Sequence, residues 1–246
     1  MKNIWYIAKK EYASLFNSPV AYVILLVTFL TLGFFFWIEI NYAVQYQQYV
    51  PSMSNTFSLL VFPLLFFAVP AITMRSIADE NKSGTLELLL TSPVRDWELI
   101  IGKWLGCLFF FLFTLMVTLI YPLVLNTMID KGIDFGLVFS GYLGVILLIS
   151  AMCGIGVFIS SLFNNQIAAL FATLGVLILF WIISAPAQLF QGSVTADVLT
   201  YLSLTEHYYD TFLTGIIQLK DIIYYLSFTA LTLLMANISI DIRRWR

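Results

Sequence analysis

The chain has 246 residues, of which 61% are hydrophobic and 11% are charged, and its formal net charge is −2. Soluble domains average about 45–50% apolar and about 25% charged residues, so this composition excludes a soluble globular protein and predicts a polytopic membrane protein. The net charge says nothing about partners, because the two signs are distributed by side of the membrane.

The first segment, residues 3–17, precedes any apolar run long enough to span a bilayer. On a helical wheel its apolar side chains fill one continuous arc of about 120°. A basic helix with an aromatic-bearing arc is typical of the membrane interface, where it either only anchors the first span or also contacts a cytoplasmic partner. The candidate residues of this amphipathic interfacial helix are Trp5, Lys9, Lys10, Tyr12 and Phe16.

Six apolar runs follow, and each is long enough, at about 1.5 Å per residue, to cross the hydrocarbon core as a helix. The second run contains Pro63 and Pro70. Prolines are tolerated at membrane depth where neighbouring helices satisfy the freed carbonyls, so we expect a kinked, internal helix. The chain is expected to form one transmembrane domain, 1–246. The predicted spans are 20–38, 57–74, 104–125, 136–163, 167–190 and 222–240.

Residues 75–103 form a charged island between the second and third spans, with four of the twelve Lys and Arg residues and five of the fourteen Asp and Glu residues. Within it, 84–91 has the pattern of a short helix, with Ser83 as N-cap and with Pro93 unable to continue it. Two turns are too few for a stable isolated helix in water, so this helix must be docked. We interpret its docking partner as another protein, and that contact as the function.

The distribution of Lys and Arg orients the chain. One side of the membrane would carry ten of them, and the other side only Lys131 and Lys220. The positive-inside rule therefore predicts that both termini and the 75–103 loop lie in the cytoplasm.

The outer connection 184–221 is half apolar, yet too short and too polar to span. We expect it to lie at the outer face of the membrane or to dip into it. Thr205 is a candidate N-cap for a helix that ends at Gly215. The single histidine, His207, could be a metal ligand or a base, but we favour a structural histidine with satisfied hydrogen bonds.

The spans hold few groups that ion coupling requires. No ionisable residue occurs within 135–196. This argues against an ion-coupled carrier, although backbone carbonyls can also bind ions. Glu39, at the end of the first span, is expected at the membrane interface. The small-residue spacing Gly102-x-x-x-Gly106 permits close helix contact, but it is a weak signal.

The pair Gly102-Lys103 lacks the upstream glycine and the following Ser or Thr of a phosphate-binding loop, so we expect no ATP site of that kind. A zinc-protease motif and a nucleophile–base pair are missing too. We therefore expect no catalytic, cofactor or metal site in this chain.

Several stretches resemble the first cytoplasmic loop of type-2 ABC exporter permeases. The match is closest to the subgroup that contains the gliding-motility permease GldF and the nitrous-oxide-reductase maturation permease NosY. It covers nearly the whole chain, and the run 84–93 is its most specific part. Within that loop, 71–76, Asp79-Glu80 and Gly102-Lys103 match as well. Lys10-Glu11 and 17–19 resemble the start of the subgroup's chains, and His207-Tyr208 with Gly215 and Asp221 resembles their last outer loop.

This resemblance implies the permease subunit of an ATP-binding-cassette exporter in the bacterial plasma membrane. Such permeases have six spans, pair as homodimers or heterodimers, and bind separate cytoplasmic ATPase subunits that hold ATP and Mg²⁺. It implies that 84–91 is the coupling helix, 3–17 the interface helix and 198–215 a re-entrant lip. No nucleic-acid partner is expected. The coupling candidates are Glu80, Gly84, Thr85, Leu86, Glu87, Leu89, Leu90, Thr91 and Pro93, and the lip candidates are His207, Tyr208 and Gly215.

Two other classes stay open at this stage. A stand-alone channel or ion-coupled carrier would transport without ATP. An intramembrane enzyme would have His207 as its last candidate catalytic group. The apolar spans would suit a lipid, a lipid-linked molecule or a large amphiphile, but bundle walls are apolar whatever the substrate.

Overall fold

The computed structural model describes residues 2–46, 51–84, 95–129, 132–190 and 193–244. Every regular element in these ranges is helical, so the predicted all-α class is confirmed. Six stretches are long and apolar enough to cross a membrane, as predicted. These are Pro19–Gln45, Met53–Ser83, Asp96–Met128, Phe135–Leu162, Gln166–Ala187 and Leu219–Ile242.

The first, fourth and sixth spans are single helices, and the other three combine several elements. In chain order the elements are α1 (Lys2–Phe16), α2 (Pro19–Gln45), α3 (Met53–Pro63), the π-helix η1 (Leu64–Ala68), α4 (Val69–Thr73), α5 (Ala78–Ser83), α7 (Asp96–Thr118), α8 (Ile120–Met128), α9 (Phe135–Leu162), α10 (Gln166–Ile182), the 3₁₀-helix η2 (Ala185–Phe190), α11 (Val194–Leu202), α12 (Glu206–Asp210), the 3₁₀-helix η3 (Phe212–Thr214) and α13 (Leu219–Arg244).

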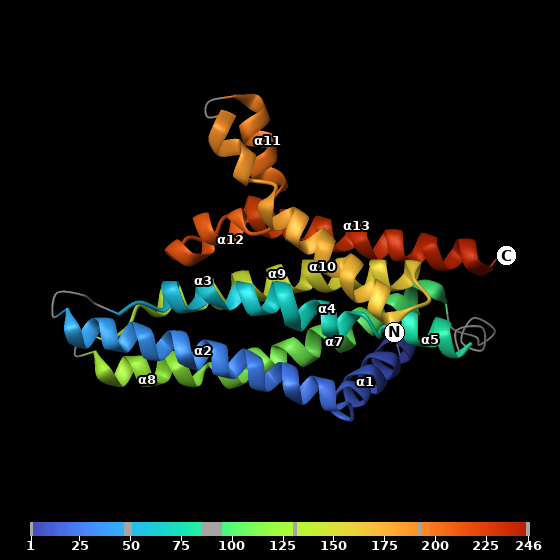
Figure 1. Cartoon of the computed structure of the whole chain (residues 1–246), viewed down its shortest axis with the longest axis horizontal. Helices are drawn as coiled ribbons and strands as arrows, with labels where there is room; N and C mark the ends of the chain where they lie inside the picture. Colours follow the sequence, from blue (N-terminus) through green and yellow to red (C-terminus); the bar gives the residue numbers. More distant parts are fainter. Residues whose placement is uncertain (1, 47–50, 85–94, 130–131, 191–192, 245–246) are drawn as a thin grey trace.

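The long helices α2, α3, α7, α8, α9 and α13 run along one axis as a bundle (Figure 1). Helix α1, α5 and the C-terminal end of α13 lie toward one end of this bundle, and the end of α2 and the start of α3 lie at the opposite end (Figure 1). The structure therefore places the termini and the described parts of the 75–103 loop on a common side, as the charge distribution predicts.

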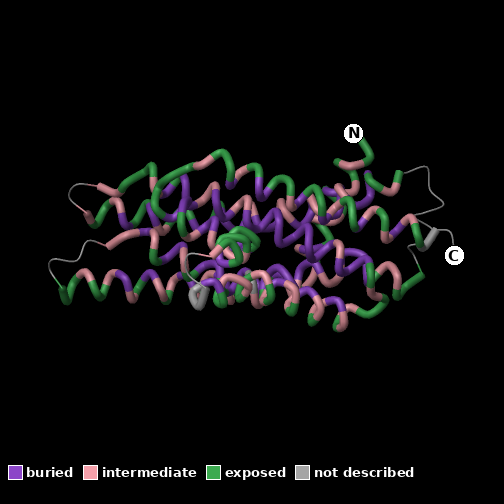
Figure 2. Tube along the Cα trace, turned by 90° about the horizontal axis from the view of Figure 1, so that it is seen from above, coloured by how far each residue is buried: buried purple, intermediate pink, exposed green. Residues whose placement is uncertain are grey.

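Helix α9 forms the centre of the bundle, where buried residues follow the long axis (Figure 2). Residues 148–157 are buried on every face of the helix. Its glycines admit neighbouring elements at short range: a Cβ on Gly144 would lie 2.6 Å from the Cβ of Phe212, and one on Gly156 would overlap Thr73. Interhelical approach at small residues is the usual packing device inside membranes.

The second span is irregular where its prolines predict it. Pro63 ends α3 directly before the π-helix η1, and Pro70 lies in the first turn of α4. Proline lacks an amide hydrogen and interrupts the regular helix hydrogen-bond ladder, and π-helical turns are one local adjustment that satisfies freed carbonyls. Both prolines are buried, so the expectation of an internal helix is confirmed.

The first span continues past its predicted end at residue 38 to Gln45. Glu39 is only 6% exposed, so protein atoms cover it, and its expected position at the level of the membrane interface stays a prediction. One of its carboxylate oxygens accepts a 3.1 Å hydrogen bond from the Ser52 amide, and the Asn55 side chain lies 3.4 Å from the carboxylate. A carboxylate at the start of α3 satisfies orphan donors and faces the positive end of the helix dipole.

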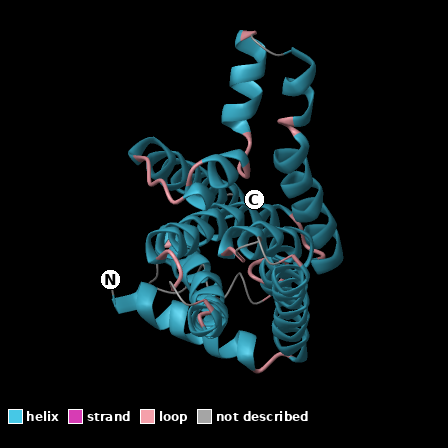
Figure 3. Ribbon diagram, turned by 90° about the vertical axis from the view of Figure 1, so that its left-hand side faces the viewer, coloured by secondary structure: helices cyan, strands magenta, loops and turns pink. Residues whose placement is uncertain are grey.

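The fifth span is shorter than predicted, because α10 ends at Ile182 and is followed by η2. Together η2 and α11 form an arm that projects away from the bundle axis (Figures 1 and 3). The chain returns with α12 and η3, whose side chains Tyr208 and Phe212 are fully buried. The helix expected from Thr205 to Gly215 is thus divided into these two short elements.

Candidate functional site

The described ends of the 75–103 loop meet at Lys103, a lysine on α7 that is only 2% exposed. Its ammonium nitrogen lies 2.8 Å from Glu80 Oε1 on α5 and 3.4 Å from Glu11 Oε2 on α1. It also donates a 2.6 Å hydrogen bond to the Ser76 carbonyl. The three donors of the ammonium group are matched by three acceptors. We call Lys103, Glu11, Glu80 and the Ser76 carbonyl the Lys103 hub.

The hub contains one cation and two carboxylates, and Glu80 is the closer counter-ion. Burial raises the pKa of the Glu11 carboxyl, and the Lys103 charge opposes this effect only in part. Moving an ammonium ion out of water costs several kcal/mol, which only paired and hydrogen-bonded partners offset. The hub therefore persists only while α1, α5 and α7 stay together.

Two glycines of α7 bring α1 close enough for this pairing. A Cβ on Gly102 would lie 2.7 Å from the Cβ of Ile7, and one on Gly106 would lie 2.6 Å from the Cβ of Glu11. At the start of α7, the Asn3 amide nitrogen donates a 3.0 Å hydrogen bond to Glu98. The weak Gly102-x-x-x-Gly106 signal thus marks the contact between α1 and α7.

The described part of the loop is also attached to α9 and α10. The Ser160 hydroxyl of α9 accepts 3.0 Å hydrogen bonds from the amides of Ile77 and Ala78. The Gln166 side chain at the start of α10 bonds to Asp79. Helix α5 is thus held by contacts with α7, α9 and α10.

A polar groove of about 570 Å³ opens beside the hub, between the second half of α1 and α5. The Arg75 guanidinium crosses it and donates a 2.7 Å hydrogen bond to the Ser18 hydroxyl. Charges of both signs line its walls, so the groove favours neither an anionic nor a cationic ligand. The charged lining residues are Lys10, Glu11, Arg75, Asp79, Glu80 and Lys103.

The structure corrects the start of the predicted coupling helix. Gly84 has a φ of 70° and is the left-handed C-cap of α5, a conformation that glycine adopts without a Cβ penalty. Ser83 is the last residue of α5 and donates to the carbonyls of Asp79 and Glu80. Of the coupling candidates, Glu80 lies in the hub. The others, Thr85, Leu86, Glu87, Leu89, Leu90, Thr91 and Pro93, fall outside the described residues.

The aromatic arc predicted for 3–17 lies against α7. The Trp5 ring meets Phe109 edge-on with 5.8 Å between centroids. The Phe16 ring packs on Phe110 at 5.4 Å and on Phe113 at 5.3 Å. The Tyr12 ring contacts the Phe16 ring at a tilt, with 4.9 Å between centroids, while Lys9 and Lys10 are exposed on different sides of the helix.

At the outer segment, His207 is held on both ring nitrogens. Its Nδ1 lies 2.8 Å from Asp221 Oδ1 and its Nε2 lies 2.9 Å from the Tyr201 carbonyl, while the ring stacks on Tyr224 at 4.0 Å. A carbonyl only accepts, so Nε2 carries a hydrogen. Both ring nitrogens therefore have a hydrogen-bond partner, as predicted for a structural histidine.

The other two lip candidates, Tyr208 and Gly215, lie against α9. Tyr208 is buried against Gly144 of α9, and burial raises the pKa of its phenol well above the usual range. Gly215, with a φ of 85°, ends η3 in the left-handed region. The Ser140 hydroxyl of α9 donates a 2.8 Å hydrogen bond to the Phe212 carbonyl and fixes the segment to the bundle. Within the described residues no cluster of three or more His, Cys, Asp and Glu side chains could hold a metal ion.

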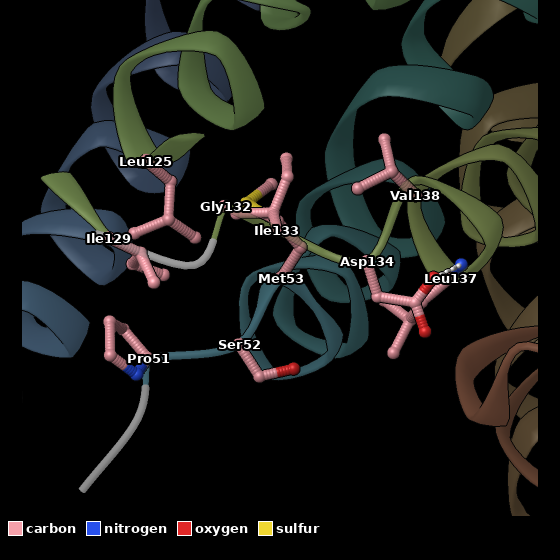
Figure 4. Close-up of a pocket in the computed structure, with 10 residues that line it drawn as sticks. All are labelled: Pro51, Ser52, Met53, Leu125, Ile129, Gly132, Ile133, Asp134, Leu137 and Val138. Atoms are coloured by element: carbon pink, nitrogen blue, oxygen red, sulfur yellow. Dashed lines mark hydrogen bonds between the residues drawn. The ribbon is translucent and has the colours of Figure 1, made fainter. Parts of the chain in front are cut away.

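A smaller cavity of about 330 Å³ lies between the start of α3, the end of α8 and the start of α9 (Figure 4). Asp134 is its single ionisable lining residue among those described, and this carboxylate caps α9 by accepting from the amides of Gly136 and Leu137. The remaining lining is mostly apolar, so this cavity brings no reactive group together.

The chain was compared with known proteins. Residues 5–240 match the family model described as ABC-2 family transporter protein. No curated protein matches the chain. The matched range includes the six candidate spans almost completely, the Lys103 hub and the outer segment with His207.

Proposed function

This chain belongs to the ABC-2 transporter family, and from that membership we propose that it couples ATP hydrolysis on another chain to export across the membrane. It is a multi-pass membrane permease subunit of an ABC transporter. Family membership implies an ABC ATPase partner. In the proposal, that partner binds ATP and Mg²⁺, and this chain binds neither.

We further propose that the chain belongs to the GldF and NosY subgroup, on the basis of the 84–93 run. The proposed setting is the bacterial plasma membrane with both termini in the cytoplasm. Two observations support the orientation: the termini and the described loop ends lie at one end of the bundle (Figure 1), and ten of the twelve Lys and Arg residues belong to that side.

The Lys103 hub is the observation that carries the coupling proposal. In this proposal the ATPase binds 84–91 and displaces it when ATP binds. Because Gly84 connects this segment to α5 and Arg95 connects it to α7, both helices move with it. Because Lys103 joins α5 to α7 and α1, spans two and three move together with the interfacial helix. Packed cores respond to such shifts by switching between discrete arrangements.

The double change Glu87→Arg with Leu89→Asp tests whether the ATPase binds the chain through 84–91. It reverses one charge and places a carboxylate on the apolar face of the proposed coupling helix. We expect co-purification of the ATPase subunit to fall by at least about tenfold, the equivalent of ~1.4 kcal/mol of binding free energy.

A matched double change at the other end of the bundle, Leu219→Asp with Lys220→Glu, should leave the complex intact. Undiminished assembly of the Glu87→Arg, Leu89→Asp protein would contradict the coupling proposal. Transport by the purified chain alone, without ATP, would favour the rival channel or ion-coupled carrier.

We propose that a second permease subunit packs on α10 and on the arm of η2 and α11. Helix α10 is strongly apolar, yet Ile167, Phe171 and Leu179 are exposed in the isolated chain, with Phe171 at 65%. In α11, Val194 and Val198 are exposed as well.

Single cysteines along α10, in a background with Cys107→Ala and Cys153→Ala, test this arrangement for a homodimer. We expect oxidation to produce a band of twice the monomer mass for cysteines on the Phe171 side. A cysteine at Ile223, which is exposed on α13, serves as the control. Cross-linking at Ile223 that equals or exceeds that at α10 would contradict a homodimer through this face.

A further inference from the structure

A second, apolar groove of about 540 Å³ lies between α1 and α7. Trp5, Lys9 and Tyr12 line it from α1, and α7 lines it between Phe109 and Met116. At about 100° per residue, these α1 positions lie on the flank opposite Lys10 and the polar groove. Helix α1 therefore separates two grooves of different chemistry.

The charge among the described lining residues of this groove is positive and comes from Lys9. Lys9 is exposed, and no carboxylate occurs among the described lining residues. Trp5 and Tyr12 combine an apolar ring with a polar tip, the pairing enriched at the headgroup level of membranes. The α7 wall is apolar and open, with Met116 70% exposed. A cation at the rim of an apolar channel is complementary to an anionic amphiphile.

We propose that this groove binds one anionic phospholipid, with its phosphate on the Lys9 ammonium group and one acyl chain along α7 from Phe109 to Met116. The lipid comes from the cytoplasmic leaflet, a point that rests on the proposed orientation of the chain. Bound there, it holds α1 against α7. The opposite flank of α1 carries Glu11 into the Lys103 hub, so a lipid that holds α1 against α7 also supports the contact through which coupling is proposed to pass.

Lys9 predicts a preference for anionic over zwitterionic lipid. A basic side chain near an anionic membrane surface contributes about 1 kcal/mol, which corresponds to about fivefold in binding. The apolar wall binds acyl chains of either lipid class equally. The preference should therefore depend on Lys9 and not on the wall.

Quenching of Trp5 fluorescence measures this occupancy in the purified chain. Phosphatidylglycerol and phosphatidylcholine with the same brominated acyl chains are compared in mixed bilayers. The Trp5 signal is the difference between the wild-type protein and Trp5→Phe. We expect half-maximal quenching at an about fivefold lower mole fraction of phosphatidylglycerol than of phosphatidylcholine.

Lys9→Gln should abolish the preference, and the matched change Lys10→Gln on the opposite flank should retain it. Equal quenching by the two lipids in the wild-type protein would overturn the proposal. If Lys10→Gln lost the preference for phosphatidylglycerol to the same extent, the proposal would also be overturned. The preference would then come from the general positive charge of the surface and not from Lys9. Glycerol phosphate in solution should not compete, and full competition would reveal an anion site in place of a lipid site. No ATPase takes part, so failure of the coupling proposal would leave this result unchanged.

Discussion

Replacement of Lys103 by methionine is expected to lower the free energy of unfolding of the solubilised protein by about 3–5 kcal/mol. Methionine fills a similar volume but carries no charge. Glu80 and Glu11 would then be left with carboxylates that the ammonium group neutralises at 2.8 Å and 3.4 Å. Uncompensated buried charges are among the most destabilising changes in a protein interior.

Thermal unfolding in detergent checks this expectation, with Lys10→Gln as the control for a lysine that is exposed on the same end of the bundle. The combined change Lys103→Met, Glu80→Gln, Glu11→Gln removes all charges of the hub and should recover most of the lost stability. A melting temperature of Lys103→Met equal to that of the wild-type protein would contradict the hub as a structural joint.

Replacement of His207 by alanine, in the outer segment, is expected to lower the free energy of unfolding by a similar amount, about 3–5 kcal/mol. Asp221 is fully buried, and His207 is its hydrogen-bond partner at 2.8 Å. Without the ring, the buried Asp221 side chain loses its hydrogen-bond partner, and Tyr224 loses the ring on which it stacks at 4.0 Å.

Stability and activity together separate the roles proposed for His207. If the histidine is structural, His207→Ala lowers the melting temperature, and adding Asp221→Asn restores part of it by removing the buried acidic group that has lost its partner. A His207→Ala protein of wild-type stability that has lost all activity would contradict the structural role. That result would instead favour an intramembrane enzyme.

The sequence alone determined the features that depend on the local hydrophobic period and on the length of apolar runs. Apolar runs of sufficient length predicted six spans, and the helical period of 3–17 predicted α1, because both signals reside in neighbouring residues. Pro63 and Pro70 likewise marked the irregular part of the second span. Gly215 marked the end of the outer helical segment.

Only the tertiary structure decided which charged groups meet. Lys103 follows a charged loop in the sequence, yet its partner Glu11 is 92 positions away in the chain. Glu39 stood at the end of an apolar run, but the α3 terminus makes it a buried cap. The reason is physical. A buried charge is stable only when a distant element supplies its counter-ion, and hydrophobic period carries no information about which element that is.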